Sequence, residues 1–485
     1  MTFKTLFSFA TSVALCGLVA CSGGGGSGSG GSGTDTGPGG NGTGQSSARE
    51  MVLHWNHVSV DASGLDHTSS GAHEQLGPTR SSRAMAIVHI AVFDAITAIE
   101  GRYEPYLPTA PAPAGADVEA AIAQAAHDTL VALFPSQTAA FDQQLASDLA
   151  KIPDGQAKLD GIAVGQGTAA AILADRANDG ASTNTGPYQF GQEPGDWRKD
   201  PLNPNQTPLG ADWKYVRPFV IQSADQFRIP PPPALDSLEY ASAYDEVQRL
   251  GGDGVVTPTE RTEDQTQTGL FWAYDGTPSL CAPPRLYNQI TTQLCQQQGL
   301  DMVDTARALA LTNVAMADAG ISSWESKFHY NFWRPVQGIR ESDAGTGPTG
   351  KGDGNPDTVG DPNFTPLGAP ASNLSGPNFT PPFPSYPSGH ATFGGALFET
   401  LRNVFGTDNV AFTFVSDELN GTTRDHNGNV RPLAPRSFSS LSQAEEENGQ
   451  SRIYLGIHWA FDKTQGIAQG EHVADYVFER AFRPK

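Results

Sequence analysis

The chain has 485 residues, of which 38% are hydrophobic and 17% charged, and this composition is ordinary for a globular protein with a substantial buried core. Its 52 acidic residues outnumber its 30 basic residues, and the formal net charge is -22 at pH 7. Such a charge repels phosphate backbones and anionic membrane surfaces, so we expect no nucleic-acid partner. It also makes any local cluster of Lys and Arg side chains informative.

The first residues are typical of an export signal. Lys4 precedes an apolar run over residues 6–20 that is too short for a typical membrane-spanning helix. The run ends in Leu18-Val19-Ala20-Cys21, which resembles the lipobox at which bacterial lipoproteins are cleaved and acylated. We predict a lipoprotein signal peptide over residues 1–20. The mature protein would be exported and anchored by lipid on Cys21, in the outer membrane or facing the periplasm; a plain secretory signal is the alternative.

Residues 21–47 are mostly Gly, Ser, Thr and Asn, which bury too little apolar surface to offset the entropy of ordering, so this range is predicted to be a flexible tether. Beyond it, apolar periodicity predicts helices, and strand-like alternation is scarce. The predicted fold is all-α, with two halves resembling four-helix bundles over residues 48–245 and 246–485. The clearest helical patterns cover residues 81–100, 117–134, 138–151, 156–178, 301–324, 391–405 and 466–482.

Two long stretches interrupt the helices. Residues 186–233 and 343–385 are rich in Pro, Asn, Asp and Gly, and long irregular loops inside a compact domain are usually functional. Cys281 and Cys295 would remain after processing of the N-terminus. In an oxidising compartment they would form a short-range disulfide, or else remain two free thiols.

Three later segments combine a cation or a His with small hydrogen-bond donors. In the first, KFHYNFWRP (327–335), Lys327 and Arg334 are seven residues apart, which on a helix returns to nearly the same face. Two cations on one aromatic-rich face are costly unless an anion lies between them.

The second segment, PSYPSGHATF (384–393), places Ser388, Gly389 and His390 at a helix start, where free N–H groups and the helix dipole favour an anion. The third, SRIYLGIHWAFD (451–462), has Arg452, His458 and, one turn later, Asp462. Each segment alone has a structural explanation: cations paired with carboxylates, a plain helix cap, a buried His. Their joint occurrence, in this order and at these spacings, favours one oxyanion site.

The three segments together resemble the signature shared by vanadium haloperoxidases and acid phosphatases of the type 2 phosphatidic acid phosphatase superfamily. That signature is Lys, six residues, Arg-Pro; Pro-Ser-Gly-His; and Ser-Arg, five residues, His. Four further stretches resemble the chloroperoxidase-like branch of the haloperoxidases, namely SRAMAIVHIAVFDAI (82–96), FWAYDG (271–276), PPRLYNQI (283–290) and SDELNGTTRD (416–425).

The resemblance implies a metal site in the C-terminal half with vanadate as cofactor, and phosphate would be able to occupy the same site. His458 would coordinate the metal, His390 would act as acid and base, and Asp275 would pair with Arg452. Asp462 would orient the His458 imidazole, or else be a surface carboxylate. The oxygens of the anion would be held by Lys327, Arg334, Ser388, the Gly389 N–H and Arg452.

The implied activity is the oxidation of a halide by hydrogen peroxide to a hypohalous species, which would react with a small organic acceptor. Trp324 and Phe383 match the positions beside the halide, where aromatic residues accompany chloride oxidation in the family; we therefore expect bromide and also chloride to react. The alternative is an acid phosphatase with His458 as nucleophile. A third possibility is a lipoprotein that keeps this fold but only binds or serves as a scaffold.

Overall fold

The computed structural model of the protein describes residues 42–485, with side chains from Ser47 onward. The predicted signal peptide, Cys21 and most of the predicted tether lie outside the described residues, and they stay predictions. The described elements are α1 (Gly42–Asp66), α2 (Gly77–Glu100), α3 (Val118–Leu133), α4 (Thr138–Leu149), α5 (Gln156–Arg176), α6 (Leu238–Leu250), α7 (Glu263–Phe271), α8 (Pro283–Gln297), α9 (Met302–Tyr330), α10 (Pro335–Arg340), α11 (Gly389–Phe405), β1 (Phe412–Phe414), β2 (Arg436–Phe438), α12 (Leu441–Tyr454) and α13 (Ala460–Arg480).

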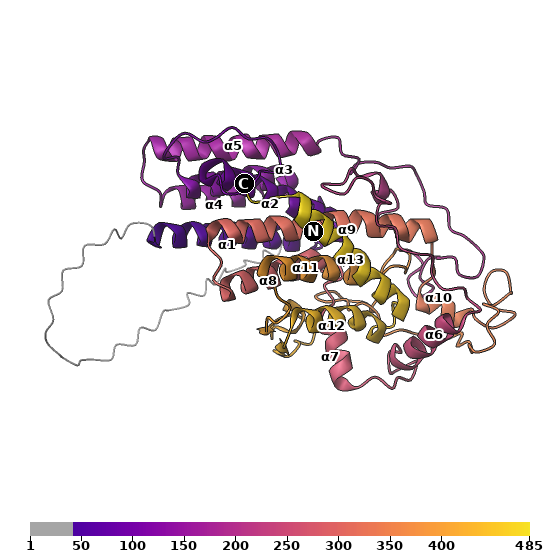
Figure 1. Ribbon diagram of the computed structural model, residues 1–485. Coiled ribbons are helices and arrows are strands. Elements are labelled where there is room, and N and C mark those ends of the chain that lie inside the picture. Colours follow the sequence, from indigo (N-terminus) through magenta and orange to yellow (C-terminus); the bar gives the residue numbers. More distant parts are fainter. Residues whose placement is uncertain (1–41) are drawn as a thin grey trace, which may run out of the picture. The chain divides into compact units, whose positions relative to one another are not determined.

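The predicted all-α fold is confirmed (Figure 1). In the described part of the chain the only sheet is the short antiparallel pair β1–β2, in which Phe412 lies opposite Phe438. Helix α1 begins inside the range predicted to be tether, and α9 runs on to Tyr330, beyond the predicted end at residue 324. Lys327 therefore lies in the last turn of a helix.

Long helices packed side by side form a continuous core. Helix α2 packs on α3 and α9, α3 on α5, α9 on α11, and α11 on α13. Helix α2 is long and apolar enough to cross a membrane, but 83% of its apolar window is buried, so it is explained as a core helix. Residues 42–485 form one compact unit. The predicted division into halves at residue 245 is not tested by this packing and stays a prediction.

Glycines let α13 press against the start of α11. A Cβ atom on Gly470 would lie 2.2 Å from the Thr392 carbonyl oxygen, and one on Gly466 would lie 2.9 Å from that of Ser388. Any larger residue would therefore push the two helices apart. This close approach fixes the position of the α11 N-terminus relative to α13, and both of these helix starts carry candidate site residues.

The two long loops are ordered and packed on each other. The Leu209 N–H donates to the Pro382 carbonyl (2.9 Å), and the Trp324 indole N–H donates to the Leu209 carbonyl (3.1 Å). The disulfide alternative is wrong, because Cys281 and Cys295 are both buried free thiols. The Cys281 sulfur instead lies 2.8 Å from the Ser63 hydroxyl.

A buried carboxylate fastens the first long loop to α9. Asp318, which is 0% exposed, accepts hydrogen bonds from the backbone N–H groups of Phe219 (2.6 Å), Val220 (2.7 Å) and Ile221 (2.9 Å). These N–H groups lie where the loop passes the helix that carries Lys327. The carboxylate thus satisfies backbone donors that would otherwise be buried without partners.

We predict that Asp318→Asn destabilises the protein by about 1–3 kcal/mol, because its amide replaces one acceptor oxygen with a donor facing backbone N–H groups. The measurement is the midpoint of thermal or urea unfolding. The matched control is Asp236→Asn, an exposed carboxylate at the end of the same loop region. Equal midpoints for the two variants would contradict the proposed role of Asp318.

Candidate active site

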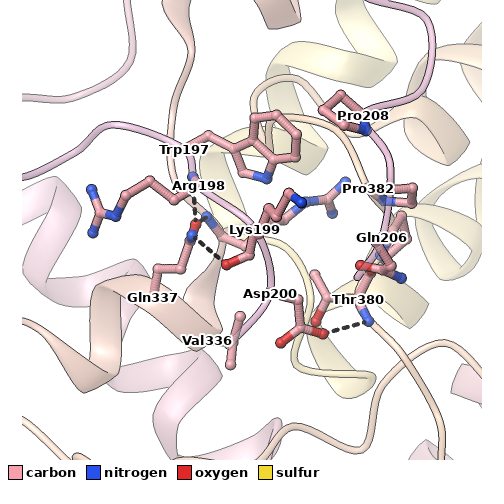
Figure 2. A pocket seen from close by; sticks show the side chains of 12 residues that line it. Trp197, Arg198, Lys199, Asp200, Gln206, Pro208, Val336, Gln337, Thr380 and Pro382 are labelled. Carbon is pink, nitrogen blue, oxygen red and sulfur yellow. Dashed lines mark hydrogen bonds between the residues drawn. The ribbon is translucent and has the colours of Figure 1, made fainter. Parts of the chain in front are cut away.

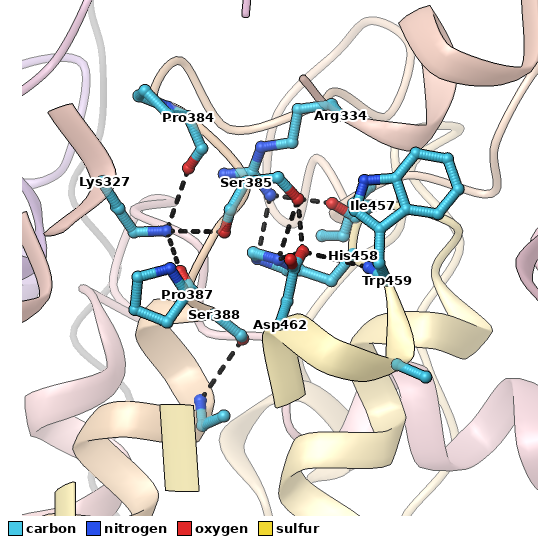
Figure 3. Close-up of polar contacts among 12 residues, drawn as sticks. Lys327, Arg334, Pro384, Ser385, Pro387, Ser388, Ile457, His458, Trp459 and Asp462 are labelled. Carbon is cyan, nitrogen blue, oxygen red and sulfur yellow. Dashed lines mark hydrogen bonds and ion pairs between the residues drawn. The ribbon is translucent and has the colours of Figure 1, made fainter. Parts of the chain in front are cut away.

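The three sequence segments converge at one buried place, shown in Figure 3. They come from the end of α9 and the turn before α10, from the loop that leads into α11 with its first turn, and from the end of α12 with the start of α13. The cations Lys327, Arg334 and Arg452 are 0%, 1% and 1% exposed, so water contributes little to their stabilisation.

Lys327 fixes the loop before α11. Its ammonium group donates to the carbonyls of Pro384 (3.0 Å) and Ser385 (2.9 Å) and to that of Pro387. An ammonium group has three donors, so contact with an anion would require one of these carbonyls to be exchanged. Its charge also lies over aromatic rings, 5.6 Å from the Trp324 centroid and 5.2 Å from that of Phe383.

The expectation that Lys327 and Arg334 share one helix face is wrong. Helix α9 ends at Tyr330 because Asn331 takes a left-handed conformation (φ 52°), and Arg334 precedes α10 as its N-cap. The turn nevertheless directs the guanidinium back into the site. Its Nε donates to the Phe383 carbonyl (3.0 Å) and its Nη1 to the Ile457 carbonyl (2.8 Å), while Nη2 has no partner among residues 42–485.

His458 is held in one tautomer. Nδ1 lies 2.7 Å from the Asp462 carboxylate, and Nε2 lies 2.9 Å from Nη1 of Arg334. Arginine has no acceptor, so Nε2 must carry the lone pair and Nδ1 the proton. The pKa of His458 lies well below its usual value because of burial and then of Arg334, Lys327 and Arg452. The Nε2 lone pair therefore points toward cations, and it accepts a hydrogen bond from Arg334 that coordination of another group would have to replace.

Asp462 is buried and holds the start of α13, so the surface-carboxylate alternative is wrong. It also accepts hydrogen bonds from the Trp459 N–H (3.0 Å) and from the Ser385 hydroxyl. Burial raises its pKa to about 6, although these donors and the nearby Lys327 favour the charged form. Sequence reasoning missed Ser385, because a hydroxyl directly after a proline carries no signal of its partner.

Arg452 pairs with Asp275, as expected. Nη2 of Arg452 lies 2.7 Å and 2.9 Å from the two carboxylate oxygens. Nε and Nη1 of the same guanidinium are buried without a hydrogen-bond partner in the described chain. Two of its three nitrogens are therefore available to an anion.

His390 lies in the first turn of α11. Its Nε2 donates to the Ala273 carbonyl and lies 4.0 Å from Asp275, which leaves Nδ1 as the unprotonated nitrogen. Burial, followed by the charge of Arg452, holds its pKa well below the usual value. Ser388 caps the helix through its hydroxyl oxygen, which accepts from the Ala391 N–H (3.4 Å), and so its hydroxyl proton is free to be donated.

The segment that carries Ala273 and Asp275 is supported from behind by Glu418, which sequence reasoning missed. Tyr274 between them is left-handed (φ 43°), and its N–H donates to the Glu418 carboxylate (3.2 Å). Glu418 is fully buried and pairs with Arg431. The sequence places Glu418 in a stretch that resembles the family, but nothing in that stretch indicates a contact with Tyr274.

The whole arrangement suits a small oxyanion. Three buried cations face two carboxylates, and unpartnered guanidinium nitrogens remain on Arg334 and Arg452. As the first residue of α11, Gly389 adds an N–H that the helix leaves free. Within the described chain, no group of three or more His, Cys, Asp or Glu could hold a metal cation.

Two cavities adjoin the site. One, of about 220 Å³, reaches Asp275, Gly389 and His390, and is walled by Trp324 and Phe383, whose ring centroids are 4.9 Å apart. The other, of about 10 Å³, lies against Arg334. It is lined by the first long loop, including Lys199 and Asp200 (Figure 2), and has room for roughly one water molecule.

Comparison with known proteins supports this picture. The family model described as "Vanadium chloroperoxidase N-terminal domain" matches residues 45–224, and the one described as "VCPO second helical-bundle domain" matches residues 307–484. The chain is 33% identical to vanadium chloroperoxidase from Curvularia inaequalis, over 85% of this chain and 78% of that protein.

Solved structures share the fold. The crystal structure of a bacterial vanadium-dependent iodoperoxidase matches with a TM-score of 0.71 and 24% identity, over 89% of this chain and 97% of that one. A holo-type bacterial vanadium-dependent chloroperoxidase matches with a TM-score of 0.61 and 16% identity, over 85% of this chain and 94% of that one. At these identities the matches show the fold alone.

We predict that Arg452→Ala weakens the binding of inorganic phosphate, a tetrahedral oxyanion, by about 10–100-fold, because charge-assisted hydrogen bonds are worth roughly 1.5–3 kcal/mol. Isothermal titration calorimetry measures this directly. Arg424→Ala is the control, because Arg424 is exposed and donates to the Gly428 carbonyl. Equal affinities for the two variants would show that Arg452 does not bind the anion.

Proposed function

The chain belongs to the vanadium chloroperoxidase family, and from that premise we propose that it is a vanadium-dependent haloperoxidase, which oxidises a halide with hydrogen peroxide to a hypohalous species. The observation that carries the proposal is the unprotonated Nε2 of His458, held among Arg334, Lys327 and Arg452. A metal oxyanion needs a nitrogen lone pair to coordinate the metal and cations to bind its oxygens, and this arrangement offers both. Phosphomonoester hydrolysis, the alternative, is not favoured by these relatives.

Vanadate fits the residues present. Nη2 of Arg334 and Nε and Nη1 of Arg452 are buried donors without partners, and they would hold its oxygens together with Ser388 and the Gly389 N–H. His458 would coordinate through Nε2, with Asp462 keeping the proton on Nδ1. When bound, vanadate supplies a Lewis acid that activates hydrogen peroxide toward attack by halide.

His390 supplies the proton transfer. Its Nδ1 lone pair accepts a proton from the incoming hydrogen peroxide, and the resulting imidazolium is stabilised by the Ala273 carbonyl and by Asp275 at 4.0 Å. Burial and Arg452 keep the ring neutral before peroxide arrives. The group is therefore in its basic form when the substrate enters.

We predict different losses for the two histidines. His458→Ala removes the coordinating nitrogen and abolishes tight vanadate binding, measured by calorimetry, while circular dichroism shows an intact fold. His390→Ala retains vanadate but loses roughly 10²–10⁴-fold in bromination rate, because a general acid–base is lost. His472→Ala, an exposed residue of α13, is the control for both. If both site variants bound vanadate as tightly as the parent, the roles would be wrong.

The proposal includes bromide and also chloride as substrates. Trp324 and Phe383 are buried against Lys327, and such apolar walls exclude water and strengthen local electrostatic interactions. Chloride is harder to oxidise than bromide and depends more on that environment. Phe383→His, which adds a polar ring, is therefore expected to lower chlorination of dimedone more than bromination. Bromination by the parent protein without any chlorination would limit the activity to bromide.

A further inference from the structure

The larger cavity beside His390 offers more room than the halide and peroxide need. Its volume is about 220 Å³, and the chain that lines it comes from α2, α9, α11 and both long loops. Apolar cavities of roughly 150 Å³ bind benzene in other proteins. The space therefore suits a ring-sized organic molecule placed directly against the site.

The walls of this cavity are apolar and partly aromatic. Leu76 and Pro78 line it from the start of α2, Leu209 from the first long loop, Phe379 from the second and Phe393 from α11. Aromatic walls favour an aromatic guest, because rings gain from offset or edge-to-face contacts beyond their buried area.

Apart from His390 and the Gly389 N–H, which belong to the anion site, the polar groups that reach the cavity have little capacity left for a charged ligand. His67 is occupied at both ring nitrogens, with Nδ1 at 2.7 Å from the Ser63 carbonyl and Nε2 accepting from the Gly77 N–H (2.9 Å). Asp275 is paired with Arg452. Burying an ion against the outer walls would leave it without a counter-charge, so a neutral guest is favoured.

We propose that this cavity binds the organic acceptor and that the acceptor is a small, neutral, electron-rich aromatic molecule; this inference rests on the haloperoxidase function proposed above. The hypohalous species then forms beside the bound ring. The ring carbon forms a bond to the halogen as the oxygen–halogen bond breaks, and the ring proton leaves with the hydroxide as water. The bound ring competes with escape of the hypohalous species into solvent.

The test uses phenol as the probe and binding as the readout. Ligand-observed NMR titrations measure the binding of phenol to the full protein. The buffer contains phosphate, which is expected to occupy the anion site beside the cavity. Leu209→Trp and Leu76→Trp each fill the cavity from a different wall, so that one misfolded variant does not leave the question open. The control is Leu202→Trp, on the same loop as Leu209 but 42% exposed and outside the cavity lining.

We expect saturable binding of phenol to the parent and to Leu202→Trp, and at least a tenfold loss in each filled variant that retains the parent's circular dichroism. Absence of binding to the parent, or unchanged binding in the filled variants, would overturn the proposal. Bromide-dependent consumption of hydrogen peroxide by the vanadate-loaded parent, measured without any organic molecule, tests the haloperoxidase function separately. If no bromide-dependent consumption of hydrogen peroxide is observed, the haloperoxidase function is refuted, whether or not phenol binds.

Discussion

Burial of positive charge is the constraint on which the site depends. Lys327, Arg334 and Arg452 are almost completely buried, and the nearby carboxylates of Asp275 and Asp462 do not match them in number. Burying a cation without a partner costs free energy. The fold offsets part of this cost with backbone carbonyls that accept hydrogen bonds from the side chains of Lys327 and Arg334. The remaining guanidinium N–H groups have no partner among the described residues. The same groups therefore destabilise the site when no anion is bound, and they would bind one.

The helices keep these charges from moving apart. Gly466 and Gly470 let α13 touch the first turn of α11, so that Asp462 and Ser388 share one small region, where the Ser388 N–H donates to the Asp462 carbonyl (3.0 Å). Glu418 in turn holds the left-handed residue Tyr274, next to the partner of Arg452. A site of fixed charges needs such support, because a displacement of about 1 Å weakens every hydrogen bond in it.

The sequence predicted the helical class, and it singled out three segments that the structure brings to one buried place, because the charged segments and the apolar periodicity are local patterns. Features that depend on tertiary contacts could not be predicted from the sequence. The Lys327–Arg334 spacing predicted one helix face, but Asn331 ends the helix and a turn brings Arg334 back. Helix α12 was missed because its buried face includes Glu445, Asn448 and Arg452 and so shows no continuous apolar stripe. The partners of Glu418 and Ser385 are distant in sequence, and no spacing rule reports them.

The most direct measurement is the halogenation of dimedone by the purified protein with bromide and hydrogen peroxide, before and after addition of vanadate. The account predicts bromination that appears with vanadate and falls again when inorganic phosphate competes for the same cations. Hydrolysis of a phosphomonoester in the same preparation, with no bromination at any vanadate concentration, would contradict it.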